Sequence, residues 1–440
     1  MAAGQLPRAM ECAAAPRSLR IALVYSRIPF PMMRGDQMTV AHLISFLAAR
    51  GHQVDLYTLG VDGSLDSTQE QWLHRACRTV RIYHQPWHAK LAGLGVGLFR
   101  LQPLQVSIFR NPGLRRDLDH AIGIDEYDVV YCYYPRTAPA IPNSVKAAPG
   151  TASFLALQLS QTLNTKRMAR NERGRLKRLV YRLEAVLMGR YEARVWQEFN
   201  KVVLIGPADV AAVREQCRIH GQPEIDNWIY GAHGTDTDKY VPASPSEIVP
   251  GRVIFSGSML YPPNIQAVLW FVEHVWPTVR ARIPGATFVV QGRDPAPRIV
   301  ELDGQDGISV TGTVPDVGVL IRSAQVCVNP MLAAGGMQNK LIEYMACNKA
   351  VVATSVANEG IMAPHDALVI ADTPNAFAEA VIRLLRHPDE AERLGGVART
   401  YVLSNWTWEK HFLELEEAFY GALDEHCGDG GAPRRHPGQR

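Results

Sequence analysis

Apolar runs alternate with amphipathic stretches along most of the chain, and the alternation begins with the continuous apolar run Ile21–Tyr25. Such runs are typical of parallel sheets, whose strands are buried on both faces. An amphipathic helical stretch follows, Gly51 favours its end, and residues 53–59 form the next expected strand. This order is one βαβ unit. Residues 127–134 and 201–205 are expected to be later strands of the same sheet.

The alternation restarts after a Pro-, Ser- and Ala-rich stretch at 242–250, which is typical of a linker. Helices are expected at 264–273, 276–282 and 340–347. Strands are expected at 253–256, 287–291, 308–311, 326–329, 350–354 and 368–370. The pattern predicts an α/β protein with two facing, doubly wound, Rossmann-like parallel-sheet domains. Ligands of such sheets lie at the carboxyl ends of the strands, so we expect each domain to hold one substrate.

The 440-residue length also exceeds one ordinary hydrophobic core and favours two domains. The expected parts are a disordered N-terminus (1–18), a first domain (19–241), a second domain (251–400), a helix returning towards the first domain (401–425) and a disordered tail (426–440). The tail is rich in Gly, Pro and Arg, and such a composition buries too little apolar surface to fold.

Composition excludes several classes of protein. The net charge of +3 is too small to indicate a nucleic-acid partner. Seven scattered cysteines without a C-x-x-C pair indicate neither a zinc site nor a disulfide framework. No apolar run approaches the roughly 18 residues that a transmembrane helix needs. We therefore expect a globular protein of the reducing cytoplasm.

The strongest candidate for chemistry is the stretch AGGMQNKLIEYMACNKAVVAT, which predicts a glycine turn, a short helix and a strand. Gly335 and Gly336 let the backbone approach a ligand closely. The helix start offers unpaired N–H groups and the positive end of its dipole to an anion. Lys340 adds a charge, and Glu343 lies one turn further on. The pattern suits a phosphate attached to a group with hydroxyls, as in a nucleotide-sugar. The alternatives are a plain turn and a surface Lys340–Glu343 ion pair.

Weaker candidates lie elsewhere. Gly257 and Ser258 end a strand, either at a ligand or in a simple tight turn. Asp36 is either a helix N-cap or a ligand contact. Asp236 and Asp238 form Asp-x-Asp, a metal motif in another enzyme fold, but here we interpret them as turn and capping carboxylates. No catalytic metal is expected.

Residues 166–194 hold ten basic and three acidic residues, with apolar residues at helical spacing. Two interpretations fit this pattern. A basic amphipathic helix can lie on an anionic membrane. Alternatively, the apolar stripe faces the protein core and the basic face is solvated.

Four segments of the second half resemble retaining family-4 (group 1) glycosyltransferases of the GT-B fold, in particular a bacterial subgroup linked to exopolysaccharide and surface-glycan synthesis. They are Phe255–Pro277, Val310–Val317, the GGMQNKLIEYMACNKAVVAT stretch and His233–Tyr240. The loop at 29–36 (PFPMMRGD) resembles the family more weakly. The resemblance implies that the second domain binds a nucleotide-sugar donor and that the first domain is on the acceptor side.

In that family, a glutamate that corresponds to Glu343 accepts hydrogen bonds from ribose hydroxyls. A second family glutamate is replaced here by Gly335, and an Arg and a Lys that hold the diphosphate are replaced by Met259 and Asn264. We therefore expect Lys340 and backbone amides at the start of the same helix to hold the diphosphate.

The resulting site assignments cover both domains. The expected donor-binding residues are Gly257, Ser258, Gly312, Val314, Gly335, Gly336, Met337, Gln338, Asn339, Lys340 and Glu343. The expected catalytic residues are Lys340 and Glu343, with Tyr133 or Gln158 where relatives carry a histidine. Gly35 and Asp36 are expected on the acceptor side.

The expected function is transfer of a sugar from a UDP- or GDP-sugar to a hydroxyl of a glycan or lipid-linked acceptor, with retention, in surface-polysaccharide biosynthesis. We expect no metal and no cofactor, because the nucleotide-sugar is a substrate. The expected location is the cytoplasm, with peripheral contact at the inner face of the membrane if residues 166–194 bind lipid. Two alternatives remain: a non-catalytic scaffold that binds a nucleotide-sugar, and a nucleotide-sugar 2-epimerase of the same fold.

Overall fold

The structure is a computed structural model that describes residues 6–428 except for short gaps. The gaps are 8–9, 11–13, 33, 61–64, 125, 143–144, 146–149, 172–173, 232–233 and 333–336. Two compact units divide the chain: residues 1–232 with 411–440, and residues 233–410. Of the termini expected to be disordered, residues 1–5, 8–9, 11–13 and 429–440 lie outside the described residues.

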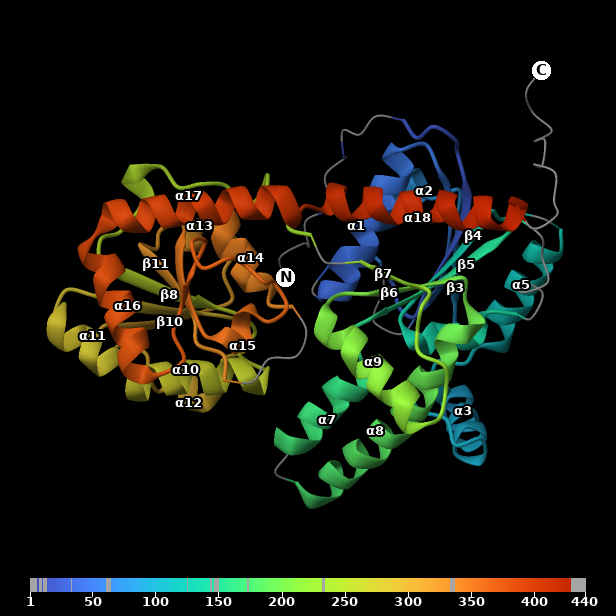
Figure 1. Cartoon of the computed structure of the whole chain (residues 1–440), viewed down its shortest axis with the longest axis horizontal. Coiled ribbons are helices and arrows are strands. Elements are labelled where there is room, and N and C mark those ends of the chain that lie inside the picture. The colour runs from blue at the N-terminus through green and yellow to red at the C-terminus, as the bar shows by residue number, and fades with distance from the viewer. Residues whose placement is uncertain are drawn as a thin grey trace. The chain divides into compact units, whose positions relative to one another are not determined.

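The first unit is built on a parallel sheet with strand order β3-β2-β1-β4-β5-β6-β7, and Figure 1 shows this sheet with its covering helices. The strands are β1 (Arg20–Tyr25), β2 (Gln53–Leu59), β3 (Thr79–Tyr83), β4 (Val129–Tyr133), β5 (Ala152–Gln158), β6 (Lys201–Leu204) and β7 (Trp228–Tyr230). From β1 the chain adds β2 and β3 on one side of the sheet, and it then crosses to add β4 to β7 on the other side of β1. The gap between these two strands is therefore a topological switch point, the usual ligand position in such sheets.

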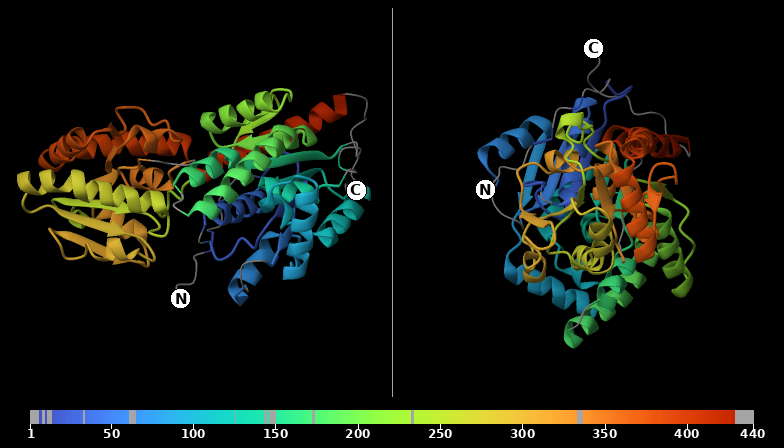
Figure 2. Two further views of the ribbon diagram at one scale, coloured as in Figure 1. Left: turned by 90° about the horizontal axis from the view of Figure 1, so that it is seen from below. Right: turned by 90° about the vertical axis from the view of Figure 1, so that its left-hand side faces the viewer.

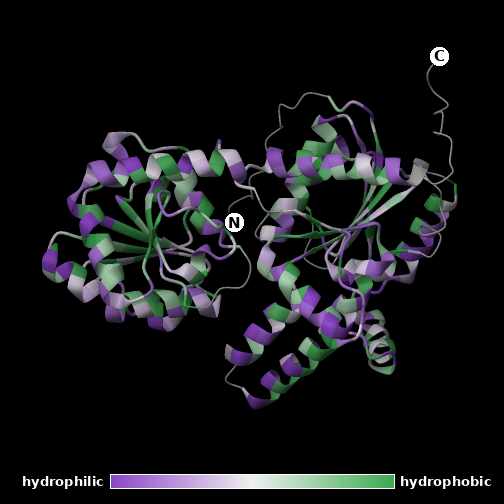
Figure 3. Cartoon of the chain, in the orientation of Figure 1, coloured by the Kyte–Doolittle hydropathy of each residue, from purple (hydrophilic) through white to green (hydrophobic). Residues whose placement is uncertain are grey.

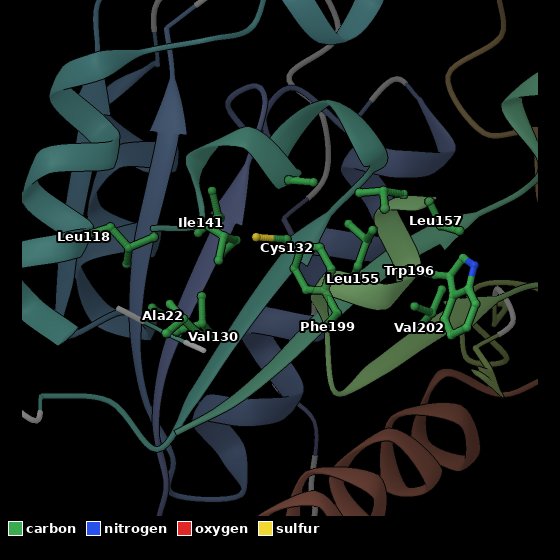
Figure 4. Close-up of a cluster of buried hydrophobic side chains, with 14 of the residues drawn as sticks. Ala22, Leu118, Val130, Cys132, Ile141, Leu155, Leu157, Trp196, Phe199 and Val202 are labelled. Atoms are coloured by element: carbon green, nitrogen blue, oxygen red, sulfur yellow. The ribbon is translucent and has the colours of Figure 1, made fainter. Parts of the chain in front are cut away.

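Helices cover this sheet and contribute their apolar sides to its core. They are α1 (Gly35–Ala49), α2 (Ser67–Ala76), α3 (Trp87–Phe99), α4 (Leu104–Ser107), α5 (Pro112–Gly123), η1 (Pro135–Ala140), α7 (Gln161–Asn171), α8 (Arg175–Val195), η2 (Trp196–Glu198), α9 (Pro207–Ile219) and α18 (Trp408–Gly428). Figure 4 shows part of that core, where side chains from β1, β4, β5 and β6 meet those of the covering helices. Cys132 lies in it as a free, buried thiol.

The last helix, α18, returns to the first unit and is held there by charged and aromatic contacts. Glu416 accepts hydrogen bonds from Arg50 (2.7 and 3.0 Å) and is 2.6 Å from the His52 ring. Burial alone would raise the pKa of Glu416, but these partners outweigh burial and lower it. Phe419 meets the Phe154 ring at 4.8 Å. The C-terminal segment is therefore part of the first unit's core.

The second unit repeats the design with strand order β10-β9-β8-β11-β12-β13, all parallel. The strands are β8 (Arg252–Ser256), β9 (Thr287–Gln291), β10 (Ile308–Gly312), β11 (Val326–Asn329), β12 (Ala350–Ala353) and β13 (Val369–Ile370). The helices are η3 (Pro245–Glu247), α10 (Pro262–His274), α11 (Trp276–Arg282), α12 (Pro297–Val300), α13 (Val317–Arg322), α14 (Asn339–Ala346), α15 (Ser355–Asn358), α16 (Pro374–Arg386) and α17 (Pro388–Asn405). Its switch point lies between β8 and β11.

Both units therefore have the predicted doubly wound α/β architecture, with helices on both faces of each sheet (Figure 2). The strands are the most continuously apolar segments, as Figure 3 shows, because both of their faces are covered. The stretch at 401–405 continues α17, and the returning helix α18 begins at Trp408. Within the described residues, no helix is both long and apolar enough to cross a membrane.

Candidate functional site

The loops after three adjacent strands of the second unit come together at the carboxyl edge of its sheet. The N–H of Gly257, after β8, donates to the carbonyl of Gln291 at the end of β9 (3.0 Å). The N–H of Gly292 donates to the carbonyl of Gly312 at the end of β10 (3.3 Å). A Cβ at Gly292 would lie 1.9 Å from the Gly257 carbonyl oxygen, so only glycine permits this approach. The structure thus brings Gly257 and Gly312 to one edge, where Ser258 and Val314 continue the same loops.

Lys340 lies at the same edge, in the first turn of α14, and is buried at 8% exposure. Its Nζ donates to Asn264 Oδ1 (2.6 Å) and lies 4.4 Å from the centre of the Phe255 ring. The interpretation of Lys340 as half of a surface ion pair is therefore wrong. Helix spacing places Lys340 beside Glu343, but the lysine side chain turns inward to the switch point instead.

Gly257 passes directly beside this ammonium group. A Cβ on Gly257 would lie 3.2 Å from Lys340 Nζ and 2.7 Å from Asn264 Nδ2. Asn264 also donates through Nδ2 to the Ser258 carbonyl (2.9 Å), so it fixes the loop and the lysine together. Gly257, Ser258 and Lys340 thus meet, and Asn264 holds them in place.

Among the described residues, the direct contacts of Lys340 Nζ are all neutral. Its near contacts are Asn264, the face of Phe255 and Met331 Sδ (3.8 Å), and no carboxylate of the described residues forms an ion pair with it. Burial lowers its pKa to about 7, against a smaller opposing effect of the Glu343 charge. Buried ammonium groups are normally paired with an anion. The arrangement therefore favours an anionic ligand at this position.

Replacing Lys340 by Met is expected to stabilise the protein at pH 7. A folded-state pKa lowered from 10.5 to about 7 means that folding opposes the charged form. This cost is complete below pH 7 and fades as the pH rises towards 10.5. At about 1.4 kcal/mol per pKa unit, less the lost hydrogen bond, we expect a gain of roughly 1–4 kcal/mol in urea unfolding at pH 7 and a smaller gain at pH 9.5. A less stable variant at both pH values would show that Lys340 is structural.

Glu343 lies one turn after Lys340 and is partly exposed. Burial raises the pKa of its carboxyl group, while a hydrogen bond from Tyr240 and the charges of Lys239 and Lys340 oppose that rise. Arg399 donates to the Tyr240 carbonyl (3.1 Å) and so holds that segment. Glu343 keeps acceptor capacity beyond its bond to Tyr240, because a carboxylate has about four lone-pair positions.

Helix α14 is fixed to the sheet beneath it through Tyr344. The Tyr344 hydroxyl accepts hydrogen bonds from the N–H (2.6 Å) and hydroxyl (2.9 Å) of Ser256 at the end of β8. Gln338 is the N-cap residue and is buried, while Met337 and Asn339 are partly exposed. The predicted glycine turn, Gly335 and Gly336, lies outside the described residues, as does His233.

The Asp-x-Asp segment forms a turn. Asp236 Oδ1 accepts hydrogen bonds from the N–H groups of Asp238 (3.1 Å) and Lys239 (3.0 Å), which confirms the interpretation of Asp236 as a turn carboxylate. In the part of the chain that the structure describes, no three His, Cys, Asp or Glu side chains are grouped as metal ligands.

In the first unit, the expected acceptor-side residues lie at the switch point between β1 and β4. Gly35 is the first residue of α1, and Arg34 is its N-cap, so the interpretation of Asp36 as the N-cap is wrong. Asp36 is buried and accepts a hydrogen bond from the Tyr25 hydroxyl (2.9 Å). Its carboxylate thus bonds to the last residue of β1 and does not cap α1.

Tyr133 and Gln158 end the neighbouring strands β4 and β5, and both are buried. The Tyr133 ring meets the Tyr25 ring edge-on at 5.6 Å. Gln158 has φ 64°, a left-handed conformation that costs energy for a residue with a side chain. Backbone strain of this kind clusters at functional sites, and here it lies at the ligand edge of the sheet.

The apolar stripe of α8 does not face the core, so that interpretation of residues 166–194 is wrong. Five apolar side chains of α8 are between 43% and 77% exposed, namely Leu176, Leu179, Val180, Leu183 and Val186, whereas those of Ala185, Met188, Ala193 and Val195, nearer the end of the helix, are buried. Helices α7 and α8 lie side by side and project from the rest of the first unit (Figures 1 and 2). Green and purple segments alternate along α8 in Figure 3 because exposed apolar and basic residues share its surface.

The two acidic side chains of α8 are withdrawn from that surface. Glu184 accepts hydrogen bonds from the N–H groups of Leu104 and Gln105 at the start of α4 (2.8 and 3.1 Å). Glu192 accepts a hydrogen bond from the N–H of Gln161 at the start of α7 (2.6 Å). Both carboxylates stabilise helix N-termini. The exposed charges of α8 are therefore all positive.

Two tandem doubly wound domains of this kind define the GT-B fold, and solved structures share it over nearly the whole chain. Sucrose-phosphate synthase from Thermosynechococcus elongatus has a TM-score of 0.61 at 17% identity and covers 93% of this chain and 100% of its own. Anabaena HepE in complex with UDP-glucose has a TM-score of 0.60 at 14% identity, and the match covers 92% of this chain and 100% of HepE. WaaG, a glycosyltransferase of lipopolysaccharide biosynthesis, has a TM-score of 0.60 at 16% identity and covers 91% and 100%.

The second unit carries the family match. Residues 250–387 match the family model described as "Glycosyl transferases group 1". The relatives include an uncharacterized 44.6 kDa protein in the cps region of Klebsiella pneumoniae, 21% identical over 90% of this chain and 98% of that protein. An uncharacterized glycosyltransferase of Methanocaldococcus jannaschii is 23% identical over 26% of this chain and 30% of its own. The resemblance to group 1 glycosyltransferases of the GT-B fold is therefore confirmed.

Proposed function

We propose that this protein transfers a sugar from a nucleotide-diphosphate donor, UDP- or GDP-linked, to a hydroxyl of a glycan or lipid-linked acceptor. The observation that carries the proposal is Lys340, a buried ammonium group with neutral partners at the β8–β11 switch point of a group 1 glycosyltransferase domain. A structural neighbour binds UDP-glucose. The cps region of the K. pneumoniae relative and the lipopolysaccharide role of WaaG support a function in surface-polysaccharide biosynthesis.

In this proposal the diphosphate lies against Lys340, the backbone at Gly257 and Ser258, and the N–H groups at the start of α14. Charge develops on the diphosphate as its bond to the sugar breaks, and preorganised donors aimed at that charge are usually the largest catalytic contribution. Lys340 and the helix dipole supply positive charge at this place, so no metal is required. Asn264, which replaces a family lysine, instead positions Lys340.

The other residues receive roles by position. Glu343 accepts hydrogen bonds from the ribose hydroxyls beside its contact with Tyr240. Gly312 and Val314 lie where backbone groups at the end of β10 can contact the base. Gly335, Gly336, Met337, Gln338 and Asn339 complete the donor site. Tyr133 or Gln158 acts from the acceptor-side unit, and we propose that the reaction retains anomeric configuration.

A panel of UDP-, GDP- and dTDP-sugars tests the function. We expect one donor to release its nucleotide slowly alone and faster with a crude membrane acceptor, with the sugar recovered in the acceptor. Binding without nucleotide release would contradict the proposal and favour the scaffold. Recovery of the donor with an epimerised sugar would favour the epimerase.

The affinity for UDP is expected to fall as the pH rises from 7.5 to 9. Burial lowers the pKa of Lys340 to about 7, so the free protein is largely neutral at that side chain above this pH. A diphosphate favours the ammonium form, and binding must then take up a proton, which weakens affinity by roughly tenfold over this range. The terminal phosphate, with a pKa of about 6, stays ionised. Calorimetry in buffers of different ionisation enthalpy measures the proton uptake. If a Lys340→Met variant kept the pH dependence of UDP affinity, Lys340 would not be its cause.

We also propose that α8 lies on an anionic membrane surface, where lipid-linked acceptors are located. Its exposed stripe of Leu and Val residues supplies apolar area, and its exposed charges are all basic. Interfacial helices combine these two features, and basic residues near an anionic leaflet contribute about 1 kcal/mol each. The buried positions of Glu184 and Glu192 remove the negative charges that would oppose this contact.

A further inference from the structure

A pocket in the first unit is lined by three arginines and a single carboxylate. Its volume is about 220 Å³, and it lies at the switch point between β1 and β4. The charged residues of its lining are Arg27, Arg34, Asp36 and Arg136. Arg27 follows β1 and Arg136 follows β4, so the topology of the sheet brings them to its ligand-binding edge.

Arg136 is held rigidly in this pocket. Its guanidinium lies 4.9 Å from the centre of the Phe109 ring and 4.7 Å from that of Tyr134. Its side chain is 16% exposed, and its Nε has no hydrogen-bond partner among the described residues. Stacking of this kind leaves the in-plane N–H donors free for a ligand. Burial, and then the charge of Arg27, lower the pKa of Arg136, as expected for a cation that lacks a full counter-charge.

The pocket lining holds one carboxylate for its three arginines. Asp36 Oδ2 lies 3.9 Å from Arg27 and 3.7 Å from Arg136, and it also accepts the hydrogen bond from Tyr25. Both ion-pair distances exceed the 2.7–2.9 Å of a charge-assisted hydrogen bond. The largely buried guanidinium groups of Arg27 and Arg136 thus lie near the same carboxylate oxygen, and Arg34 adds a third positive charge at the exposed rim. The pocket lining therefore carries three arginines to one carboxylate, and the Nε donor of Arg136 is unused among the described residues.

We propose that this pocket binds an oxyanion of the acceptor, so that the acceptor carries a phosphate or carboxylate group close to the hydroxyl that receives the sugar. This inference rests on the proposed function, because it identifies the acceptor class of the same transferase. Guanidinium forks match the planar, bidentate geometry of both anions. A phosphate would indicate a lipid-linked or phosphorylated acceptor, and a carboxylate would indicate an acidic sugar.

Calorimetric titration at low salt tests the proposal. The separate probes are methyl phosphate, methyl glucuronide, neutral methyl glucoside and UDP. We expect wild type to prefer one anionic probe to the neutral glucoside by at least tenfold. Arg136→Gln should lose that preference, and Arg136→Lys, which keeps the charge but not the fork, should retain only part of it. Arg34→Gln changes an exposed residue and provides a second variant that does not disturb the core. Arg218→Gln, at an exposed arginine paired with Glu215 in the same unit, is the matched control and should behave as wild type.

The outcomes distinguish failure of the acceptor pocket from failure of the donor site at Lys340. Equal binding of charged and neutral probes, or unchanged anion binding in both Arg136→Gln and Arg34→Gln, would overturn the acceptor assignment while UDP binding through Lys340 still stood. If Arg136→Gln weakened UDP as much as methyl phosphate, the pocket would serve the donor and the assignment would also fail. UDP binding that did not depend on Lys340, with anion binding intact, would instead overturn the donor site.

Discussion

Replacing Lys340 by Met is expected to weaken UDP binding by about 10–150-fold, equivalent to the 1.5–3 kcal/mol of a hydrogen bond to a charged group. Uridine, which lacks the diphosphate, should bind the variant and wild type equally. The reason is the position of Nζ beside Gly257 and Asn264, where only a charged part of the ligand gains from an ammonium group. Calorimetric titration with both ligands measures the two affinities.

Lys349→Met provides the matched control for this result. Lys349 is also a buried lysine of the second unit, but its ammonium donates to the Arg322 carbonyl (2.6 Å). Its loss should leave UDP affinity unchanged. An equal loss of UDP and uridine affinity in Lys340→Met would show that Lys340 maintains structure and does not contact the diphosphate.

Changing Leu176, Leu179 and Leu183 together to Ser is expected to reduce binding to anionic lipid vesicles by at least 100-fold. All three side chains are half exposed or more on α8, so their loss creates no cavity. Full burial of a leucine contributes about 1.5–3 kcal/mol, and partial burial of three in the interface accounts for the expected loss. Cosedimentation with vesicles that contain anionic lipid measures it.

Two comparisons make this experiment decisive. Val319→Ser with Met362→Ser removes exposed apolar side chains of the second unit, and this control should bind vesicles as wild type does. Neutral vesicles should bind wild type more weakly than anionic ones, because the exposed charges of α8 are basic. Equal vesicle binding by wild type and the triple variant would contradict a membrane contact through α8.

The fold could be predicted because most of its strands are uninterrupted apolar runs. Three strands of the first unit do not meet that criterion and were not predicted. β3 (TVRIY) lies at the sheet edge and includes exposed positions, β5 (ASFLALQ) contains no β-branched residue, and β7 is only three residues long. Hydrophobic patterning alone does not distinguish such segments from loops, and only their pairing with β2, β4 and β6 identifies them.

The candidate site was predicted in part. Glycine, lysine and helix spacing indicated Lys340, but its partner Asn264 lies 76 residues earlier in the chain and was interpreted only as a missing family lysine. The contact of Tyr240 with Glu343 likewise depends on tertiary structure. Helical spacing in α8 revealed an apolar stripe but not its direction. The direction depends on Glu184 and Glu192, which turn inward to cap neighbouring helices.

A crystal structure of the protein with UDP tests the central claim most directly. The account predicts a phosphate oxygen at about 2.7–2.9 Å from Lys340 Nζ, the distance of a charge-assisted hydrogen bond, with the diphosphate beside Gly257 and the first turn of α14. A diphosphate bound elsewhere, with Lys340 still directed only at Asn264 and Phe255, would contradict it.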